Sequence, residues 1–103
     1  MQRFPDHWDT LTCVNYLQRK ILLLSISYYM FDFSPVSDHA YDEMAHQLAD
    51  LMQRCDRVEE STYWYVYYDY EGSTGFNLFY RLNQKDKDYL ELQAKLFGRK
   101  WLK

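Results

Sequence analysis

The chain has 103 residues, enough for one domain with one hydrophobic core and too few for a catalytic domain with a separate substrate domain. Apolar residues make up 48% of it and aromatic residues 19%, which excludes an intrinsically disordered chain. Residues 1–83 hold 6 basic and 12 acidic side chains, whereas residues 84–103 hold 6 basic and 3 acidic ones. This acidic body with a basic tail argues against direct nucleic-acid binding, because attraction to phosphates needs clustered positive charge.

A first helix is predicted from about residue 10 to Phe31. Asp9 or Thr10 can cap its start. One apolar stripe at helical spacing runs along it and comprises Leu11, Val14, Leu17, Ile21, Leu24, Tyr28 and Phe31. From Ile21 onward the other faces are apolar as well, which is typical of an enclosed helix. We therefore expect this helix to be the central element.

A second helix is predicted from Ser37 to about residue 55, after a turn at Pro35. The residue before a proline is driven out of the helical region, and Ser37 is a good N-cap. Apolar residues then recur at helical spacing: Tyr41, Met44, Ala45, Leu48, Leu51, Met52 and Cys55. The two helices should form an αα-hairpin around the proline turn.

Residues 61–82 are predicted to form a β-hairpin. Residues 63–70 are rich in strand formers, residues 71–75 contain two glycines suited to a turn, and residues 76–82 alternate in polarity. A third helix is expected over 84–98, capped by Asn83 and ended by Gly98, with a basic tail after it. Its inward side chains should be Tyr89, Leu92, Leu96 and Phe97.

These elements predict a single α+β domain over residues 1–103, in the order α-α-β-β-α. The helical hairpin of residues 10–55 should pack against the aromatic β-hairpin and the last helix. An isolated β-hairpin is only marginally stable in water, so it must pack on the helices or on something else.

The apolar segment, the cysteines and the histidines indicate the cellular compartment and whether a metal site is expected. Ile21 to Phe31 is apolar over eleven residues only, well short of the roughly 18–20 that cross a bilayer, so we expect no membrane contact and a cytoplasmic protein. Cys13 and Cys55 are read as buried thiols in a reducing compartment. No His/Cys set has metal-ligand spacing, so no metal site is expected.

A motif surrounds the predicted turn. It reads Tyr28-Tyr29-x-x-Asp32-x-x-Pro35-x-Ser37-Asp38-x-x-Tyr41-Asp42-x-Met44. It resembles the N-terminal helical domain (domain Ia) of bacterial NAD-dependent DNA ligases, whose pattern is Tyr-(His or Tyr)-x-x-Asp-x-Pro-x-(Ser or Pro)-Asp-x-x-Tyr-Asp-x-Leu. The resemblance covers about residues 10–55, with Pro35 one position later than usual. In that family the domain closes over the nicotinamide mononucleotide half of NAD during self-adenylation.

The resemblance implies a cofactor site of five residues. Tyr28 and Tyr29 would flank the nicotinamide, Tyr41 would add an aromatic contact, and Asp38 and Asp42 would bind the ribose hydroxyls or the carboxamide. Aromatic faces and carboxylates also suit a planar cationic ring on physical grounds. The same residues have a purely structural reading, as helix caps and as packing partners across the hairpin.

Catalysis is not expected. The ligase reaction needs a nucleophilic lysine in a Lys-x-Asp-Gly motif, and this chain contains no Asp-Gly dipeptide. We therefore predict that the protein is not an enzyme.

The aromatic hairpin offers a second candidate site, for a protein partner. Tyrosine supplies large contact area at low entropy cost, so one sheet face could bind another protein. The candidate residues are Tyr63, Tyr65, Tyr67, Asp69 and Phe79. Stacking of nucleic-acid bases on the same face is the weaker alternative, because Arg81 is the only positive charge nearby.

Two functions remain open. The leading prediction is a non-catalytic binding protein on a ligase-like scaffold, in the form of a phage-encoded factor that inhibits or modulates a host protein complex of the anti-defence or anti-CRISPR type. It needs a protein partner and no cofactor, and a homodimer is compatible with it. The alternative is an accessory subunit of a split NAD-dependent DNA ligase, which would bind NAD or nicotinamide mononucleotide.

Overall fold

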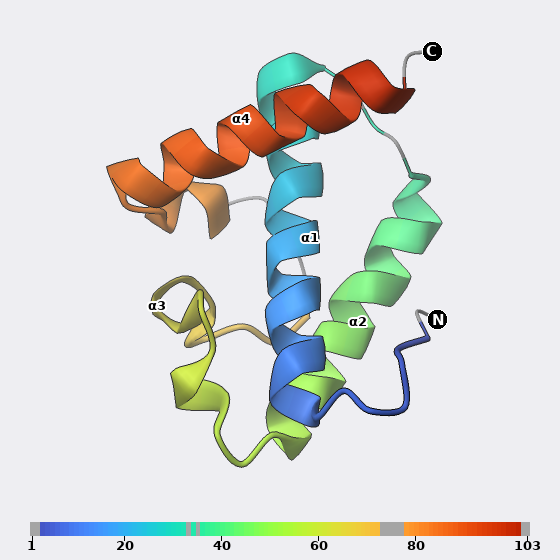
Figure 1. Cartoon of the computed structure of the whole chain (residues 1–103), viewed down its shortest axis with the longest axis vertical. Coiled ribbons are helices and arrows are strands. Elements are labelled where there is room, and N and C mark those ends of the chain that lie inside the picture. The colour runs from blue at the N-terminus through green and yellow to red at the C-terminus, as the bar shows by residue number, and fades with distance from the viewer. Residues whose placement is uncertain (1–2, 33, 35, 73–77, 102–103) are drawn as a thin grey trace.

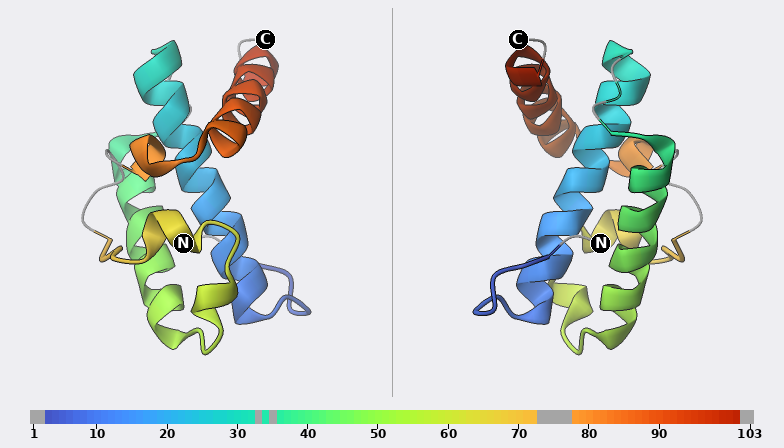
Figure 2. Two further views of the ribbon diagram at one scale, coloured as in Figure 1. Left: turned by 90° about the vertical axis from the view of Figure 1, so that its left-hand side faces the viewer. Right: turned by 90° about the vertical axis from the view of Figure 1, so that its right-hand side faces the viewer.

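The computed structural model describes residues 3–32, 34, 36–72 and 78–101, with side chains described as far as residue 96. Its α-helices are α1 (Thr10–Phe31), α2 (Asp38–Arg54), α3 (Trp64–Tyr67) and α4 (Gln84–Trp101). Two 3-10 turns, η1 (Val58–Glu60) and η2 (Leu78–Arg81), complete the order α1-α2-η1-α3-η2-α4. Helix α1 runs through the middle of the molecule and α4 crosses it (Figure 1). The side views show α1 between α2 and α4 (Figure 2).

Helix α1 confirms the predicted central element. The Asp9 carboxylate caps it by accepting the Thr12 N–H at 2.8 Å. All seven residues from Ile21 to Ser27 are buried, as expected of an enclosed helix. The next four side chains are exposed, so the helix end emerges from the core. Asp32 ends it in the left-handed conformation (φ 50°), which Asp tolerates better than most residues.

Helix α2 also confirms its prediction and lies alongside α1. The Ser37 hydroxyl caps it by accepting the Ala40 N–H at 3.1 Å. Its buried apolar residues are Met44, Ala45, Leu48, Ala49 and Met52, and Cys55 directly after the helix is buried too. Both cysteines are free and buried, as predicted. Of the predicted turn, Phe33 and Pro35 lie outside the described residues.

The predicted α+β fold is wrong, because none of the residues that the structure describes lies in a β-strand. Residues 64–67 form helix α3 and residues 78–81 form the turn η2. Residues 73–77, where the hairpin turn was expected, lie outside the description. The aromatic run satisfies a helical period as well as an alternating one, since Tyr63, Val66, Tyr67 and Tyr70 have i, i+3, i+4, i+7 spacing. Tertiary packing of that face overrides the local strand preference.

The buried side chain of Gln18 holds this aromatic segment on α1. It is fully buried; its amide N–H donates to the Ser61 hydroxyl at 3.1 Å, and its carbonyl oxygen accepts the Tyr63 N–H at 3.3 Å. The Tyr67 hydroxyl donates to the Gln18 backbone carbonyl at 2.9 Å. A buried amide without such partners would be costly, so this network specifies how residues 61–67 dock.

Helix α4 begins as predicted but presents a different face to the core. Asn83 caps it by accepting the Asp86 N–H at 2.8 Å. The inward residues are Leu90 and Ala94, whereas the predicted inward residues Tyr89, Leu92 and Leu96 are exposed and Phe97 lies beyond the described side chains. The helix also continues past Gly98 to Trp101, because one glycine costs a helix only about 1 kcal/mol.

Gly72 seats the chain after α3 against α2. Its φ of +86° is a left-handed conformation that residues with a Cβ rarely adopt. A Cβ at this position would lie 3.0 Å from the Cβ of Ala49 and 3.4 Å from the carbonyl oxygen of Ala45. Nearby, the Tyr70 hydroxyl reaches the same Ala45 carbonyl at 3.4 Å. Glycine is therefore required both by backbone conformation and by the close approach.

Replacing Gln18 with leucine should lower the free energy of unfolding by about 2–4 kcal/mol, since the Tyr63 N–H and the Ser61 hydroxyl lose their buried partner. Urea unfolding followed by circular dichroism measures this loss. The control is Gln53→Leu on the exposed side of α2, which should change stability by less than about 0.5 kcal/mol. Equal midpoints for the two variants would contradict the role given to Gln18.

Replacing Gly72 with alanine should cost about 2–3 kcal/mol, from the left-handed φ and from the contact with Ala49. Adding Ala49→Gly removes the contact but not the backbone strain. The double variant should therefore be more stable than the sum of the two single losses predicts. If the stability losses of Gly72→Ala and Ala49→Gly measured by urea unfolding simply add, residues 72 and 49 are not in close contact.

Candidate functional site

Four aromatic rings gather where α1 emerges from the core beside η2, and we call Tyr28, Tyr29, Phe79 and Tyr80 the aromatic surface. The Tyr28 and Tyr29 rings meet edge to face at 4.9 Å, Tyr29 stacks on Phe79 at 5.8 Å, and Phe79 contacts Tyr80 at 4.1 Å between centroids. Phe79 is buried, while Tyr28, Tyr29 and Tyr80 are 51%, 42% and 73% exposed. The aromatic surface thus consists of three exposed phenol rings that lie around the buried ring of Phe79.

Arg81 fixes η2 in the position that this surface requires. Its guanidinium donates to the backbone carbonyl of Val66 at 3.0 Å, and it forms two hydrogen bonds to the Asp69 carboxylate, one of them 3.1 Å long. It also lies 5.3 Å from the centre of the Tyr68 ring. Because Arg81 ties η2 to the end of α3, Phe79 is held beneath Tyr29.

The structure brings together part of the predicted cofactor set. Tyr28 and Tyr29 are in contact, and Tyr41 is half-buried with its hydroxyl 2.9 Å from the Ser25 hydroxyl. Burial, with smaller contributions from Tyr29 and Asp42, raises the pKa of Tyr41. Asp42 is exposed beside it, and Asp38 is exposed in the first turn of α2.

The residues predicted for a protein partner are placed differently. Tyr63, Tyr67 and Phe79 are 5%, 0% and 4% exposed and belong to the core. The Tyr65 hydroxyl donates to Asp86 at 2.5 Å and accepts the Asn83 N–H, and burial together with Asp86 raises the pKa of Tyr65 to about 12. Asp69 is engaged by Arg81. Three of the five side chains are therefore core residues, and the other two, Tyr65 and Asp69, are exposed and hydrogen-bonded within the chain.

Sequence reasoning missed Tyr80 and Tyr68, which are 73% and 59% exposed. The signal that could have identified them is the helical spacing of their neighbours: once Tyr63, Val66 and Tyr67 face the core, Tyr68 must face outward. For Tyr80 the corresponding signal is the pair Phe79 and Leu82, which are both buried.

The chain segment from Tyr28 to Glu43 is acidic. Residues 28–43 include four acidic side chains and no Lys or Arg: Asp32, Asp38, Asp42 and Glu43, all exposed. His39 lies 3.2 Å from Glu43. In the described part of the chain no three His, Cys, Asp or Glu residues are placed to hold a metal ion. The segment that carries two of the exposed phenols is therefore acidic, whereas Arg81 follows Tyr80 in the chain and Lys95 lies 5.8 Å from the Phe31 ring.

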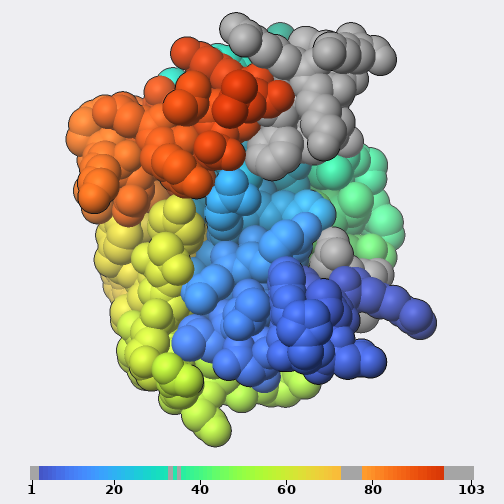
Figure 3. Space-filling model, viewed as in Figure 1, coloured from blue at the N-terminus to red at the C-terminus, as the bar shows by residue number. Residues whose placement is uncertain are grey.

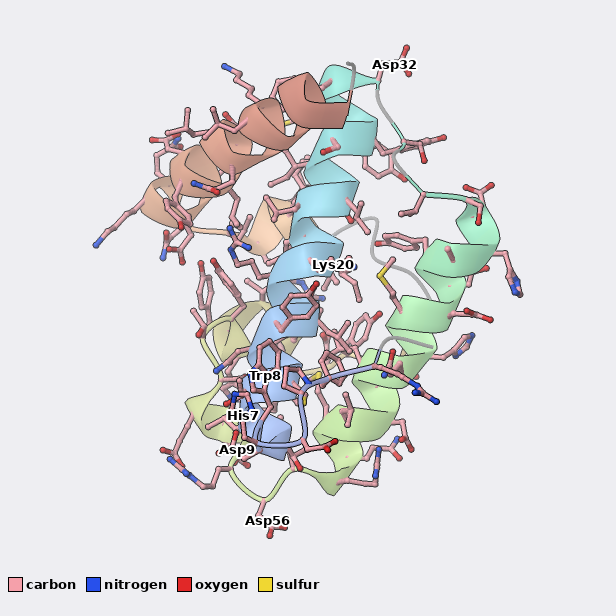
Figure 4. All side chains as sticks on the ribbon, turned by 45° about the vertical axis from the view of Figure 1, so that its right-hand side comes forward. His7, Trp8, Asp9, Lys20, Asp32 and Asp56 are labelled. Atoms are coloured by element: carbon pink, nitrogen blue, oxygen red, sulfur yellow. The ribbon has the colours of Figure 1, made fainter. Side chains whose placement is uncertain are left out.

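A second aromatic cluster, formed by Phe4, Trp8 and Tyr16, joins the N-terminal arm to α1. The three ring pairs have centroid distances of 5.7–5.8 Å, and the Lys20 ammonium lies 5.6 Å from the Tyr16 ring. Figure 4 shows Trp8 near one end of α1 and Asp32 at the other end. This cluster packs the arm against the helix, and it is remote from the aromatic surface.

Comparison with known proteins identifies no relative of this chain: no family model, curated protein or solved structure matches it. The likeness to a ligase domain therefore depends on the motif residues alone. Among the described residues, no helix has the length and apolar character needed to span a bilayer.

The half-buried phenol of Tyr41 predicts a loss of stability in alkali. Because burial raises its pKa above the ordinary value of about 10, the unfolded state releases this proton first, and the free energy of unfolding falls as pH rises beyond 10. Tyr41→Phe should make that fall less steep in urea unfolding at several pH values. Ser25→Ala is the matched control, since it removes the hydroxyl partner and keeps the phenol. An unchanged slope in Tyr41→Phe would contradict the burial.

Proposed function

We propose that the protein is a non-catalytic binding protein that contacts a partner protein through the aromatic surface and the acidic residues 32–43. The observation that supports this best is the exposure of Tyr28, Tyr29 and Tyr80 around the buried ring of Phe79. Tyrosine is enriched among the residues that dominate binding energy at interfaces. Rings that already pack against one another also lose little freedom on binding.

The charge of residues 32–43 indicates the kind of partner. The carboxylates of Asp32, Asp38 and Asp42 lie on the same part of the chain as the exposed phenols, and the first 83 residues carry twice as many acidic as basic side chains. A partner with a basic surface would be attracted over several ångströms and held by the aromatic contacts. We therefore infer a partner whose binding face is positively charged and includes an apolar or planar group.

A nucleic-acid-binding groove has this chemistry, because it is basic and often stacks flat rings. Exposed phenols beside carboxylates present the same combination of negative charge and planar faces to such a groove. One concrete form of the proposal is a phage-encoded factor that blocks a defence nuclease complex, of the anti-CRISPR type, in the cytoplasm of its bacterial host.

Affinity capture from a bacterial lysate tests the proposal when the variants and a competitor are included. We expect to capture a stoichiometric partner. Tyr28→Ala and Tyr80→Ala should each weaken the affinity for that partner about tenfold or more. Asp38→Asn with Asp42→Asn should weaken the complex mainly at low salt. Double-stranded DNA should displace the partner.

The matched control is Tyr89→Ala on α4, which removes a tyrosine of the same exposure, 51%, from a different element. It should leave capture unchanged. Capture that is insensitive to Tyr28 and Tyr80, or that is lost equally with Tyr89→Ala, would contradict the assigned surface.

Binding of a nicotinamide nucleotide is the second candidate, favoured by the contact between Tyr28 and Tyr29 at the open end of the hairpin. A pyridinium ring can lie against an exposed phenol, and Asp42 beside Tyr41 would offset its charge. Calorimetric titration with NAD and with nicotinamide mononucleotide tests this. Saturable binding that Tyr28→Ala and Asp38→Ala abolish supports the cofactor function, and absence of heat at millimolar ligand eliminates it.

A further inference from the structure

The outer face of α4 carries an apolar stripe separate from the aromatic surface. Tyr89, Leu92 and Leu96 follow one another at spacings of three and four residues, so they are neighbours on one side of the helix. They are 51%, 55% and 50% exposed, whereas Leu90 and Ala94 on the inner side are buried against the rest of the molecule. The space-filling view shows residues of α4 on the molecular surface (Figure 3). The helix thus has two apolar sides: one is buried in the fold, and the other is exposed.

Two opposite charges lie along one flank of this stripe. Asp88 and Lys95 are seven residues apart, which is about two helical turns, so both lie on the same side of Leu92. Both are exposed. Asp88 accepts a hydrogen bond of 2.6 Å from the Gln84 amide, and the Lys95 ammonium lies 5.8 Å from the Phe31 ring. Neither contact neutralises the charge.

We propose that the stripe binds the α4 stripe of a second copy of this chain, with the two helices antiparallel about a twofold axis. In an antiparallel pair the same flank of each helix meets its equivalent, with the direction reversed. Asp88 then faces Lys95 of the partner subunit, and the symmetry repeats this ion pair at the other end. In a parallel pair the twofold axis runs along the helices, so this flank would meet the opposite flank of the partner and Asp88 could not pair with Lys95. The charge pattern therefore selects the antiparallel arrangement.

The size of the stripe sets the strength of this contact. Three half-exposed side chains, with Phe31 beside Lys95, bury far less than the roughly 800 Å² per partner of a tight complex. The dimer should therefore be weak and concentration-dependent. The contact closes on itself, because each copy offers one stripe, so association should stop at two copies.

Sedimentation velocity of the full chain over a wide range of concentrations tests the proposal, with circular dichroism as the check on folding. We expect a monomer–dimer equilibrium that Leu92→Gln abolishes. Asp88→Lys and Lys95→Asp should each weaken it about tenfold, and the double variant should restore it because the pairs are re-formed with exchanged charges. Tyr80→Gln, on the aromatic surface, should leave it unchanged.

A wild-type chain that remains monomeric at the highest concentration would overturn the inference. So would a dimer that tolerates Leu92→Gln, or single charge variants that weaken association without rescue in the double variant. Rescue by the double charge exchange distinguishes the antiparallel pair from any other contact through this helix.

Discussion

The fold depends on one buried polar contact, the side-chain amide of Gln18 in the middle of α1. Its two partners, Ser61 and the Tyr63 N–H, start the segment that leads through α3 toward η2. Because a buried amide is costly unless both of its ends are hydrogen-bonded, only one docking of residues 61–67 satisfies it. That docking buries Tyr67 and positions Arg81, which in turn places Phe79 beneath Tyr29.

The aromatic surface is a consequence of this arrangement. Its exposed rings come from two parts of the chain that are about fifty residues apart, and they meet because a buried phenylalanine supports them. Exposed rings that are already in contact lose little conformational freedom when a partner binds, which makes them efficient binding residues. The start of α2, which follows Tyr28 and Tyr29 in the chain, adds the exposed carboxylates of Asp38 and Asp42.

The helices were predictable where one period dominates the sequence. In α1 and α2 the apolar spacing and the capping residues Asp9 and Ser37 point to the same structure, and both helices are present. Residues 63–70 were not predictable, because nearly every position is apolar and aromatic and therefore fits a strand and a helix equally well. The inner face of α4 was missed because Tyr89, Leu92 and Leu96 form the more apolar side of the helix, yet Leu90 and Ala94 are the residues that are buried. In the candidate site, Tyr28 and Tyr29 could be identified from a sequence motif. The positions of Phe79 and Tyr80 could not, because they depend on how residues 61–67 dock on Gln18.

The candidate site requires that residues 64–67 and 78–81 are helical turns that hold Phe79 beneath Tyr29. Nuclear Overhauser spectroscopy of the protein in solution tests it most directly. The account predicts cross-peaks between the ring protons of Tyr29 and Phe79, together with helical contacts between the amide protons of residues 64–67. Cross-strand contacts between residues 63–70 and 76–82, without the ring cross-peaks, would contradict it.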